Sequence, residues 1–171
     1  RPFEVDHGIN AFGFSFEEES SVKANKDRME ELGLSDSPKI GKLKDGEPIE
    51  WEGREIKPEE VIEEVDGRKV VYSGDTEKSE NLIKYSTNAD LLIHEATCLH
   101  EMIDERKGHT SALQAGEIAE EAKPEKLVLT HFSRRYMNRE EELKEEALEK
   151  FGAVELADEG RKFEIKPHRP E

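Results

Sequence analysis

The apolar residues of this 171-residue chain recur at two spacings, the two-residue period of β-strands and the 3.6-residue period of helices. Near the start, residues 9–16 alternate aromatic with small side chains, which predicts a half-buried strand. A short helix is predicted at Lys26–Leu32, because Gly33 ends the helical pattern. The segment Ser37–Gly46 combines lysines with turn residues and is predicted to be a loop with strand flanks.

Farther along, aliphatic and β-branched runs predict buried strands that alternate with helical patterns. The strands are expected at residues 69–73, 89–95, 126–130, 154–157 and 162–165, and the helices at residues 79–86, 111–122 and 140–151. This alternation indicates an α/β fold. Because 171 residues suffice for one domain with a real core but hardly for two, we treat 1–171 as a single unit.

Three of the predicted strands are followed, at their C-terminal ends, by polar residues that can carry chemistry. Asp75 follows the first of them, His94 and Glu95 end the second, and His131 follows the third. The C-terminal ends of the strands in an open α/β sheet converge on one crevice, where ligands and metals are held. Chance can place one such residue there, but three in succession indicate a site.

Asp75 and His131 are ordinary ligands for zinc-class metals. A bound Zn²⁺ lowers the pKa of its water and polarises a phosphate oxygen. The simpler interpretation is that Asp75 caps a turn and that His131 is a hydrogen-bonded histidine at a strand end. From local sequence alone, the two interpretations stand about level.

Glu95 and His109 form a second candidate pair. A carboxylate can hold an imidazole in one tautomer and favour its protonated form, so that the imidazolium donates a proton to a leaving oxygen. His109 lies just before a helix for which Thr110 or Ser111 could be the N-cap. Taken alone, His109 would more simply be a solvent-exposed residue before that helix.

The net charge of −16 argues against a general nucleic-acid binder, because neutralising phosphates requires Lys and Arg. Metal ions and a few basic side chains can still hold phosphates locally. The best candidates for such contacts are Lys39, Lys42, Lys44, Arg134 and Arg135, although a lysine run is usually a solvated surface. The abundance of Glu and Lys indicates equally well a hot or salty habitat.

Composition also indicates a soluble, cytoplasmic protein. No apolar run approaches the ~20 residues that cross a bilayer, and no basic-then-apolar leader is present. The single cysteine, Cys98, cannot form an internal disulfide, which fits a reducing compartment.

Four short motifs, in their order and spacing, resemble the C-terminal half of the ribonuclease Z family, tRNA 3′-processing endonucleases of the metallo-β-lactamase superfamily. The motifs are Ser73-Gly74-Asp75-Thr76, His94-Glu95-Ala96-Thr97, Gly108-His109-Thr110-Ser111-Ala112 and Leu129-Thr130-His131-Phe132-Ser133-Arg134-Arg135-Tyr136. The segments His7–Glu18 and Pro38–Gly46 are similar to a strand and a Gly/Lys loop of the same family. The resemblance implies an α/β fold that is the C-terminal half of an αββα sandwich, with a mixed sheet and helices on one face.

The resemblance also implies a function, a zinc-dependent endoribonuclease that removes the 3′ trailer of pre-tRNA and leaves a 3′-hydroxyl. Asp75 would bridge two zinc ions, and His131 would complete the shell of the second ion. His109 would be the general acid that protonates the departing 3′ oxygen, with Glu95 as its orienting partner. The intact enzyme would be a homodimer, and the residues near the tRNA end would be Lys42, Lys44, Ser133 and Arg135.

Several features of that family are missing. The His-x-His-x-Asp-His motif, a further ligand histidine and the basic exosite arm are absent, and the chain lacks an initiator Met, which suggests a fragment. His109-Thr110-Ser111 replaces the usual His-Ser-Thr, and Arg134 stands where a proline is common. Because Asp75 and His131 alone provide fewer than the three or four ligands that hold zinc well, we expect the fragment to bind metal weakly and not to cleave pre-tRNA.

Two other functions remain open from the sequence. The chain could be another hydrolase of the same fold, a phosphodiesterase or thiol-ester hydrolase, although those generally lack His-Glu-Ala-Thr followed by a Gly-His element. It could also be a non-catalytic, acidic interaction module. A His-x-His-x-Asp-His motif upstream in the reading frame would favour the nuclease over the module.

Overall fold

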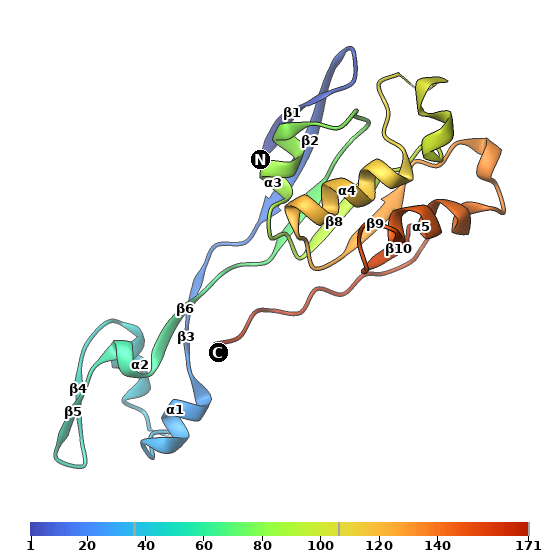
Figure 1. Ribbon diagram of the computed structural model, residues 1–171. Coiled ribbons are helices and arrows are strands. Elements are labelled where there is room, and N and C mark those ends of the chain that lie inside the picture. Colours follow the sequence, from blue (N-terminus) through green and yellow to red (C-terminus); the bar gives the residue numbers. More distant parts are fainter. Residues whose placement is uncertain (36, 106, 171) are drawn as a thin grey trace. The chain divides into compact units, whose positions relative to one another are not determined.

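The computed structural model describes residues 1–35, 37–105 and 107–170 (Figure 1). The chain divides into two compact units, where the sequence had suggested one. Unit 1 comprises Arg1–Glu17 and Arg68–Ile165, and unit 2 comprises Glu18–Gly67 and Lys166–Glu171. Each unit has its own cluster of buried apolar side chains.

Unit 1 is built on a six-stranded mixed sheet with the strand order β1-β2-β7-β8-β9-β10. β1 and β2 pair antiparallel, β2 pairs antiparallel with β7, and the strands from β7 to β10 run parallel. The strands are β1 (Pro2–Asp6), β2 (Asn10–Glu17), β7 (Lys69–Tyr72), β8 (Leu91–Glu95), β9 (Leu127–Thr130) and β10 (Val154–Leu156).

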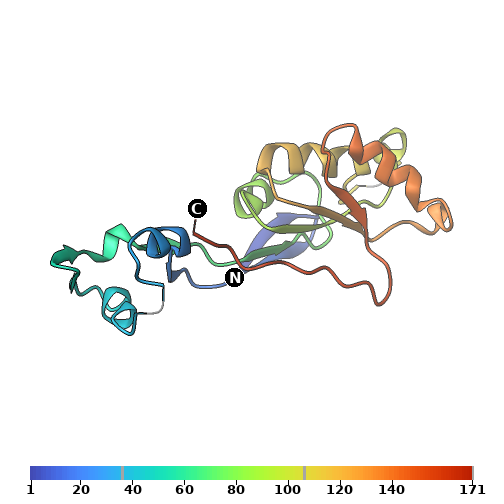
Figure 2. The same ribbon diagram turned by 90° about the horizontal axis from the view of Figure 1, so that it is seen from below.

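Three helices cover one face of this sheet, as Figure 2 shows. They are α3 (Glu80–Ser86), α4 (Ala112–Ala122) and α5 (Glu140–Leu148). Ser111 is the N-cap of α4: its hydroxyl accepts the Gln114 amide, and the Gln114 side chain accepts the Ser111 amide. The main core lies between helices and sheet, with Val71, Leu92, Ile118, Leu129 and Leu143 among its fully buried residues. The mixed sheet with helices on one face is thereby confirmed.

The opposite face of the sheet carries exposed aromatic side chains. In β2 the small residues Gly13 and Ser15 are buried, whereas Phe12, Phe14 and Phe16 are 47%, 41% and 60% exposed. A Cβ at Gly13 would collide with the Phe3 ring and crowd the Tyr72 carbonyl oxygen, which accounts for a residue without a side chain there. The aromatic side chains of β2 therefore lie on the face of the sheet opposite the helices, and its small residues lie on the buried face.

Unit 2 has a small core of its own, formed by Met29, Leu34, Leu43, Ile49, Ile56 and Val61. Its two-stranded ladders join β3 (Ser21–Ala24) to β6 (Ile62–Val65) and β4 (Ile49–Trp51) to β5 (Arg54–Ile56), both antiparallel. Its helices are α1 (Lys26–Glu31), α2 (Ile40–Lys44) and the 3₁₀ turn η1 (Pro58–Glu60). Across the described residues of both units, no helix has the length and apolar character needed to cross a membrane.

Two local predictions were wrong. Residues 40–44, expected in a loop, form the helix α2, because Leu43 is buried in the core of unit 2 and organises a turn around itself. Residues 162–165, expected to form a strand, belong to no ladder. Phe163 instead lies beneath the cations of Lys126 and Arg161, at 5.9 and 5.0 Å from its ring centroid.

Candidate metal and catalytic site

The parallel strands β7, β8 and β9 end side by side and bring together the residues singled out at their tips. β7 is followed by Asp75, β8 ends in Glu95, and β9 is followed by His131. Adjacent parallel strands deliver their carboxyl ends to one edge of a sheet, which is why these residues meet. His109 reaches the same edge from the segment that precedes α4.

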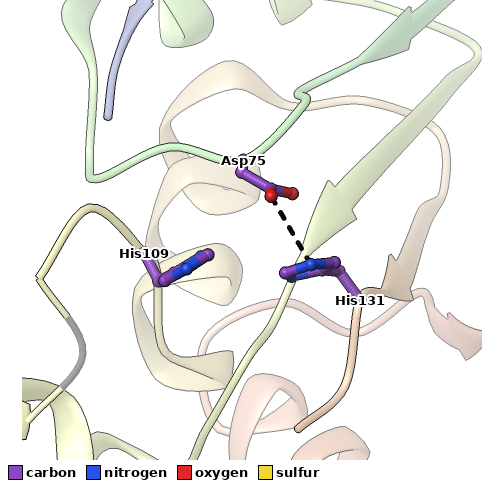
Figure 3. A group of neighbouring side chains, drawn as sticks. All are labelled: Asp75, His109 and His131. Atoms are coloured by element: carbon purple, nitrogen blue, oxygen red, sulfur yellow. Dashed lines mark ion pairs between the residues drawn. The ribbon is translucent and has the colours of Figure 1, made fainter. Parts of the chain in front are cut away.

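Asp75, His109 and His131 form the centre of the candidate site. Each offers one ligand atom, and these atoms all lie within 4.8 Å of one another. Figure 3 shows the two imidazoles pointing toward one another beside the Asp75 carboxylate. The His131 Nε2 lies 3.5 Å from the Asp75 Oδ2, and the rings of His109 and His131 are stacked with centroids 5.3 Å apart.

Glu95 is buried directly behind these imidazoles and is 1% exposed. Its Oε1 accepts hydrogen bonds from the Thr76 amide at 2.7 Å and from the His109 Nδ1 at 3.0 Å. Its Oε2 accepts the Thr97 hydroxyl at 2.7 Å. Since a buried carboxylate is costly unless its oxygens are hydrogen-bonded, these three donors explain how Glu95 is accommodated.

His131 is held in the left-handed backbone region, with φ of 59°. This region is unfavourable for a residue with a Cβ, and such strain concentrates at functional sites. The turn is supported by main-chain bonds from Ser133 N to the Thr97 carbonyl and from Ala96 N to the Thr130 carbonyl. The side chain remains 46% exposed, so it can reach a ligand.

The segment around His109 is fixed by its neighbours on both sides. The Gly108 amide donates to the Glu77 carboxylate at 2.8 Å, and the Thr110 hydroxyl donates to the Thr76 carbonyl. His7 was expected to have a structural role at the start of the segment His7–Glu18 and was not counted among the site residues. In the structure its Nδ1 donates to the Gly108 carbonyl, and its ring lies edge-on to that of His109.

His94 is adjacent to Glu95 but does not face the site's other residues. It is fully buried, its Nδ1 donates to the Glu95 carbonyl at 2.6 Å, and its Nε2 has no hydrogen-bond partner among the described residues. Burial lowers the pKa of the His94 imidazole below its ordinary value of 6.5, an effect partly opposed by the Glu95 carbonyl and charge. His94 is therefore a neutral core histidine.

The residues expected to contact substrate fall into both units. Ser133 and Arg135 follow β9 in unit 1, where Ser133 precedes the 3₁₀ turn η3 (Arg134–Tyr136) and Arg135 pairs with Glu105 at 3.5 Å on the surface. Lys42 and Lys44 lie in α2 of unit 2, and both are exposed.

The donor set fits a divalent metal. One carboxylate and two imidazoles are the protein ligands found in catalytic zinc sites, and the three ligand atoms are close enough to converge on one ion. The sequence expectation counted only Asp75 and His131, and the structure adds His109 to that group.

Comparison with known proteins defines the class of this chain. The sequence family described as the beta-lactamase superfamily domain matches residues 60–132. The crystal structure of the metallo-beta-lactamase fold protein YhfI from Bacillus subtilis covers 94% of this chain with a TM-score of 0.58, while this chain covers 47% of it. At 22% identity that likeness shows the fold alone, and the fold is that of the metallo-β-lactamases.

Curated relatives narrow the class further. A protein named ribonuclease Z from Archaeoglobus fulgidus is 38% identical over 95% of this chain, and one from Methanosarcina acetivorans is 35% identical over 100% of it. The resemblance to ribonuclease Z that the four motifs indicated is confirmed. The chain covers 55% and 57% of these two proteins, so it spans about half the length of the curated relatives it matches.

Proposed function

We propose that this chain provides one half of the active site of a metal-dependent endoribonuclease that removes the 3′ trailer of pre-tRNA and leaves a 3′-hydroxyl. The observation that carries the proposal is the convergence of Asp75, His109 and His131 at one sheet edge, with the Glu95 carboxylate hydrogen-bonded to His109. The similarity to proteins named ribonuclease Z supports it.

In this proposal Asp75 and His131 would hold zinc, and Asp75 would be a ligand shared between two ions in the complete enzyme. A divalent ion bound there would stabilise the negative charge that develops on the phosphodiester oxygens. Asp75 reaches the site as a carboxylate 36% exposed, and His131 presents its Nε2 toward it. Both side chains are therefore accessible from solvent and directed at the same point.

His109 is the proposed general acid. It would protonate the departing 3′ oxygen of the tRNA as the bond between that oxygen and phosphorus breaks. Its Nδ1 is bonded to the Glu95 carboxylate at 3.0 Å, so the ring is held with Nε2 free to face substrate. His109 also lies within the cluster of three ligand atoms, so a proton donated from it would be delivered beside the metal site.

Substrate contacts are proposed for Lys42, Lys44, Ser133 and Arg135, whose cations and hydroxyl suit phosphate oxygens. These few basic side chains would act against an overall charge of −16, so the binding must be local. We also propose a homodimer for the complete enzyme.

A reconstitution assay tests the proposed function. The 171-residue chain alone, with zinc and a pre-tRNA that has a 3′ trailer, should show no cleavage, because three donors cannot form a two-metal site. Combined with the part of the Archaeoglobus fulgidus relative that it does not cover, it should release the trailer and leave a 3′-hydroxyl. His109→Ala should abolish that activity, whereas His100→Ala, a change in an exposed histidine, should retain it.

Two outcomes would contradict the proposal. Zinc-dependent 3′ cleavage by the chain alone would show that this half is sufficient. A reconstituted protein that folds and binds zinc but hydrolyses only small phosphodiesters would favour a small-substrate hydrolase of the same fold.

A further inference from the structure

The Thr97 hydroxyl lies at the junction of the candidate site. Its Oγ1 is 2.7 Å from the Glu95 Oε2, 3.0 Å from the His131 Nδ1 and 3.3 Å from the His131 carbonyl oxygen. A longer contact of 3.4 Å joins it to the His109 Nδ1, which is closer to Glu95. Thr97 is only 6% exposed, so water does not compete freely for these contacts. One hydroxyl has a single proton and two acceptor lone pairs, and the assignment of that proton determines what its neighbours can do.

The Thr97 hydroxyl donates its hydrogen bond to the Glu95 carboxylate. The carboxylate is a charged acceptor at the shorter distance, and charge-assisted hydrogen bonds are the stronger ones. With its proton engaged there, the Thr97 oxygen can only accept from the His131 Nδ1. His131 must therefore carry a proton on Nδ1, and Nε2 is the nitrogen that lies on the side of the Asp75 carboxylate.

The same carboxylate fixes His109 without an intermediary. Glu95 has no proton to donate when ionised, so the His109 Nδ1 at 3.0 Å must be the donor. Both imidazoles are thus held through Nδ1, His109 by a direct bond to Glu95 and His131 by the Thr97 hydroxyl. Hydrogen bonds to the second ring nitrogen fix the tautomer and the orientation of a histidine that binds metal.

We propose that Thr97 is a positioning residue that transmits the orienting effect of Glu95 to His131 and sets the tautomer in which His131 binds metal. This inference rests on the proposed function for the role of His131 as a metal ligand, whereas the hydrogen bonds of Thr97 do not depend on RNA. The main chain of Thr97 reinforces the arrangement, because its carbonyl accepts from Ser133 N and its amide donates to the Thr110 carbonyl, both at 3.0 Å. Thr97 is therefore bonded to the segments that present both histidines.

The experiment compares Thr97→Val, which removes the hydroxyl at nearly constant shape, with Thr97→Ser, which keeps it. Long-range ¹H–¹⁵N correlation spectra of the metal-free 171-residue chain report the tautomer of each of its six histidines. Wild type and Thr97→Ser should show His131 protonated on Nδ1, and Thr97→Val should show a mixture of tautomers. His109 should keep its Nδ1 proton in all three, since its bond to Glu95 is direct.

Zinc affinity, measured by competition with a chromophoric chelator, supplies a second readout. Thr97→Val should weaken zinc binding about 10-fold or more, as loss of a hydrogen bond to a ligating histidine does. Thr97→Ser should restore it to within about 3-fold of wild type. The matched control is Thr87→Val at the C-cap of α3, whose exposed hydroxyl donates to the Ile83 carbonyl, and which should leave both readouts unchanged.

An unchanged His131 tautomer in a folded Thr97→Val protein, or an Nε2-protonated His131 in wild type, would overturn the inference. If Thr97→Val does not fold, failure of Thr97→Ser to keep the wild-type tautomer would overturn it equally. The outcome is separable from the proposed function, because a reconstituted protein that fails to cleave pre-tRNA would leave the tautomer result standing.

Discussion

At the scale of single residues, His94 and Glu95 are neighbours at the end of β8 that differ in how their polar atoms are hydrogen-bonded. Both are buried, but Glu95 has a donor for each of its oxygens, whereas the His94 Nε2 has no partner in the described part of the chain. Burial therefore keeps His94 neutral by lowering the pKa of its imidazole. Protonating that ring in the folded chain is therefore costly, which predicts that acid destabilises the fold.

We expect the free energy of unfolding to fall as the pH drops below about 6.5, the ordinary histidine value. The unfolded chain takes up a proton at His94 and the folded chain does not, so acid favours unfolding, by up to about 1.4 kcal/mol per pH unit for one proton. When the free energy of unfolding, measured with urea, is plotted against pH between 8 and 5, its slope should be shallower for His94→Asn than for wild type. Leu92→Val, a cavity at a buried non-titrating position of the same strand, should lower stability without changing the slope, and equal slopes in all three proteins would refute the prediction.

His131 presents a second residue-scale conflict, between backbone conformation and chemistry. Its φ of 59° favours glycine, and its half-exposed side chain adds little packing. His131→Gly should therefore be more stable than His131→Ala by roughly 0.5–1 kcal/mol, the left-handed penalty less the greater freedom of unfolded glycine. Thermal unfolding of the two variants provides the comparison, and an alanine variant as stable as the glycine variant would show that the turn is not strained. Both variants should lose zinc affinity.

At the scale of elements, the close packing of α4 on α5 depends on Gly116. A Cβ at this position would lie 2.6 Å from the Ala147 carbonyl oxygen, which belongs to the α5 backbone and cannot turn aside. Gly116→Ala should destabilise unit 1 by roughly 1–2 kcal/mol, because overpacking outweighs the gain of about 1 kcal/mol in helix propensity. Gly152→Ala, where a Cβ would meet nothing within 4 Å, should be nearly neutral in the same denaturation measurement. If Gly116→Ala were more stable than wild type, α4 and α5 would be able to move apart without loss of stability.

The elements of the main sheet were predictable where pattern and burial agree. The runs at 69–73, 89–95 and 126–130 became β7, β8 and β9, because each contributes aliphatic side chains such as Val71, Leu92 and Leu129 to the core between sheet and helices. Phe163 and Ile165 have the alternation of a strand but no neighbouring strand to pair with, and α2 depends on the burial of a single leucine. Tertiary contacts decided both cases, and local sequence does not contain them.

The residues of the candidate site were predictable where they follow strands and not where loops place them. The strand-end rule brought Asp75, Glu95 and His131 to one edge, since parallel strands place their C-terminal ends together. The packing of His7 against Gly108 and the role of Thr97 depend on loops that meet only in three dimensions. Loop conformation therefore set the limit of the sequence analysis at this site.

At the scale of the whole molecule, charge and apolar surface act in opposite directions. The net charge of −16 favours dispersal, because like charges on separate copies repel one another. The helix-free face of the unit 1 sheet favours association, because Phe12, Phe14, Phe16 and Tyr72 are all exposed there, with Phe14 directly opposite Tyr72 in the ladder. Contiguous apolar patches of this kind mark surfaces that become buried against another protein surface.

We therefore expect the isolated chain to self-associate, and to do so more strongly as salt screens the acidic repulsion. Sedimentation equilibrium at low and high ionic strength should show a mass above that of the 19.6 kDa monomer, rising with salt. The double variant Phe14→Thr/Phe16→Thr keeps residues that favour strands while removing the aromatic surface, so it should shift toward monomer. Met137→Thr removes an apolar side chain that is 64% exposed outside that sheet and should leave the association unchanged. A wild-type chain that stays monomeric at high salt would show that the aromatic face does not drive association, and the charge would then dominate at every ionic strength tested.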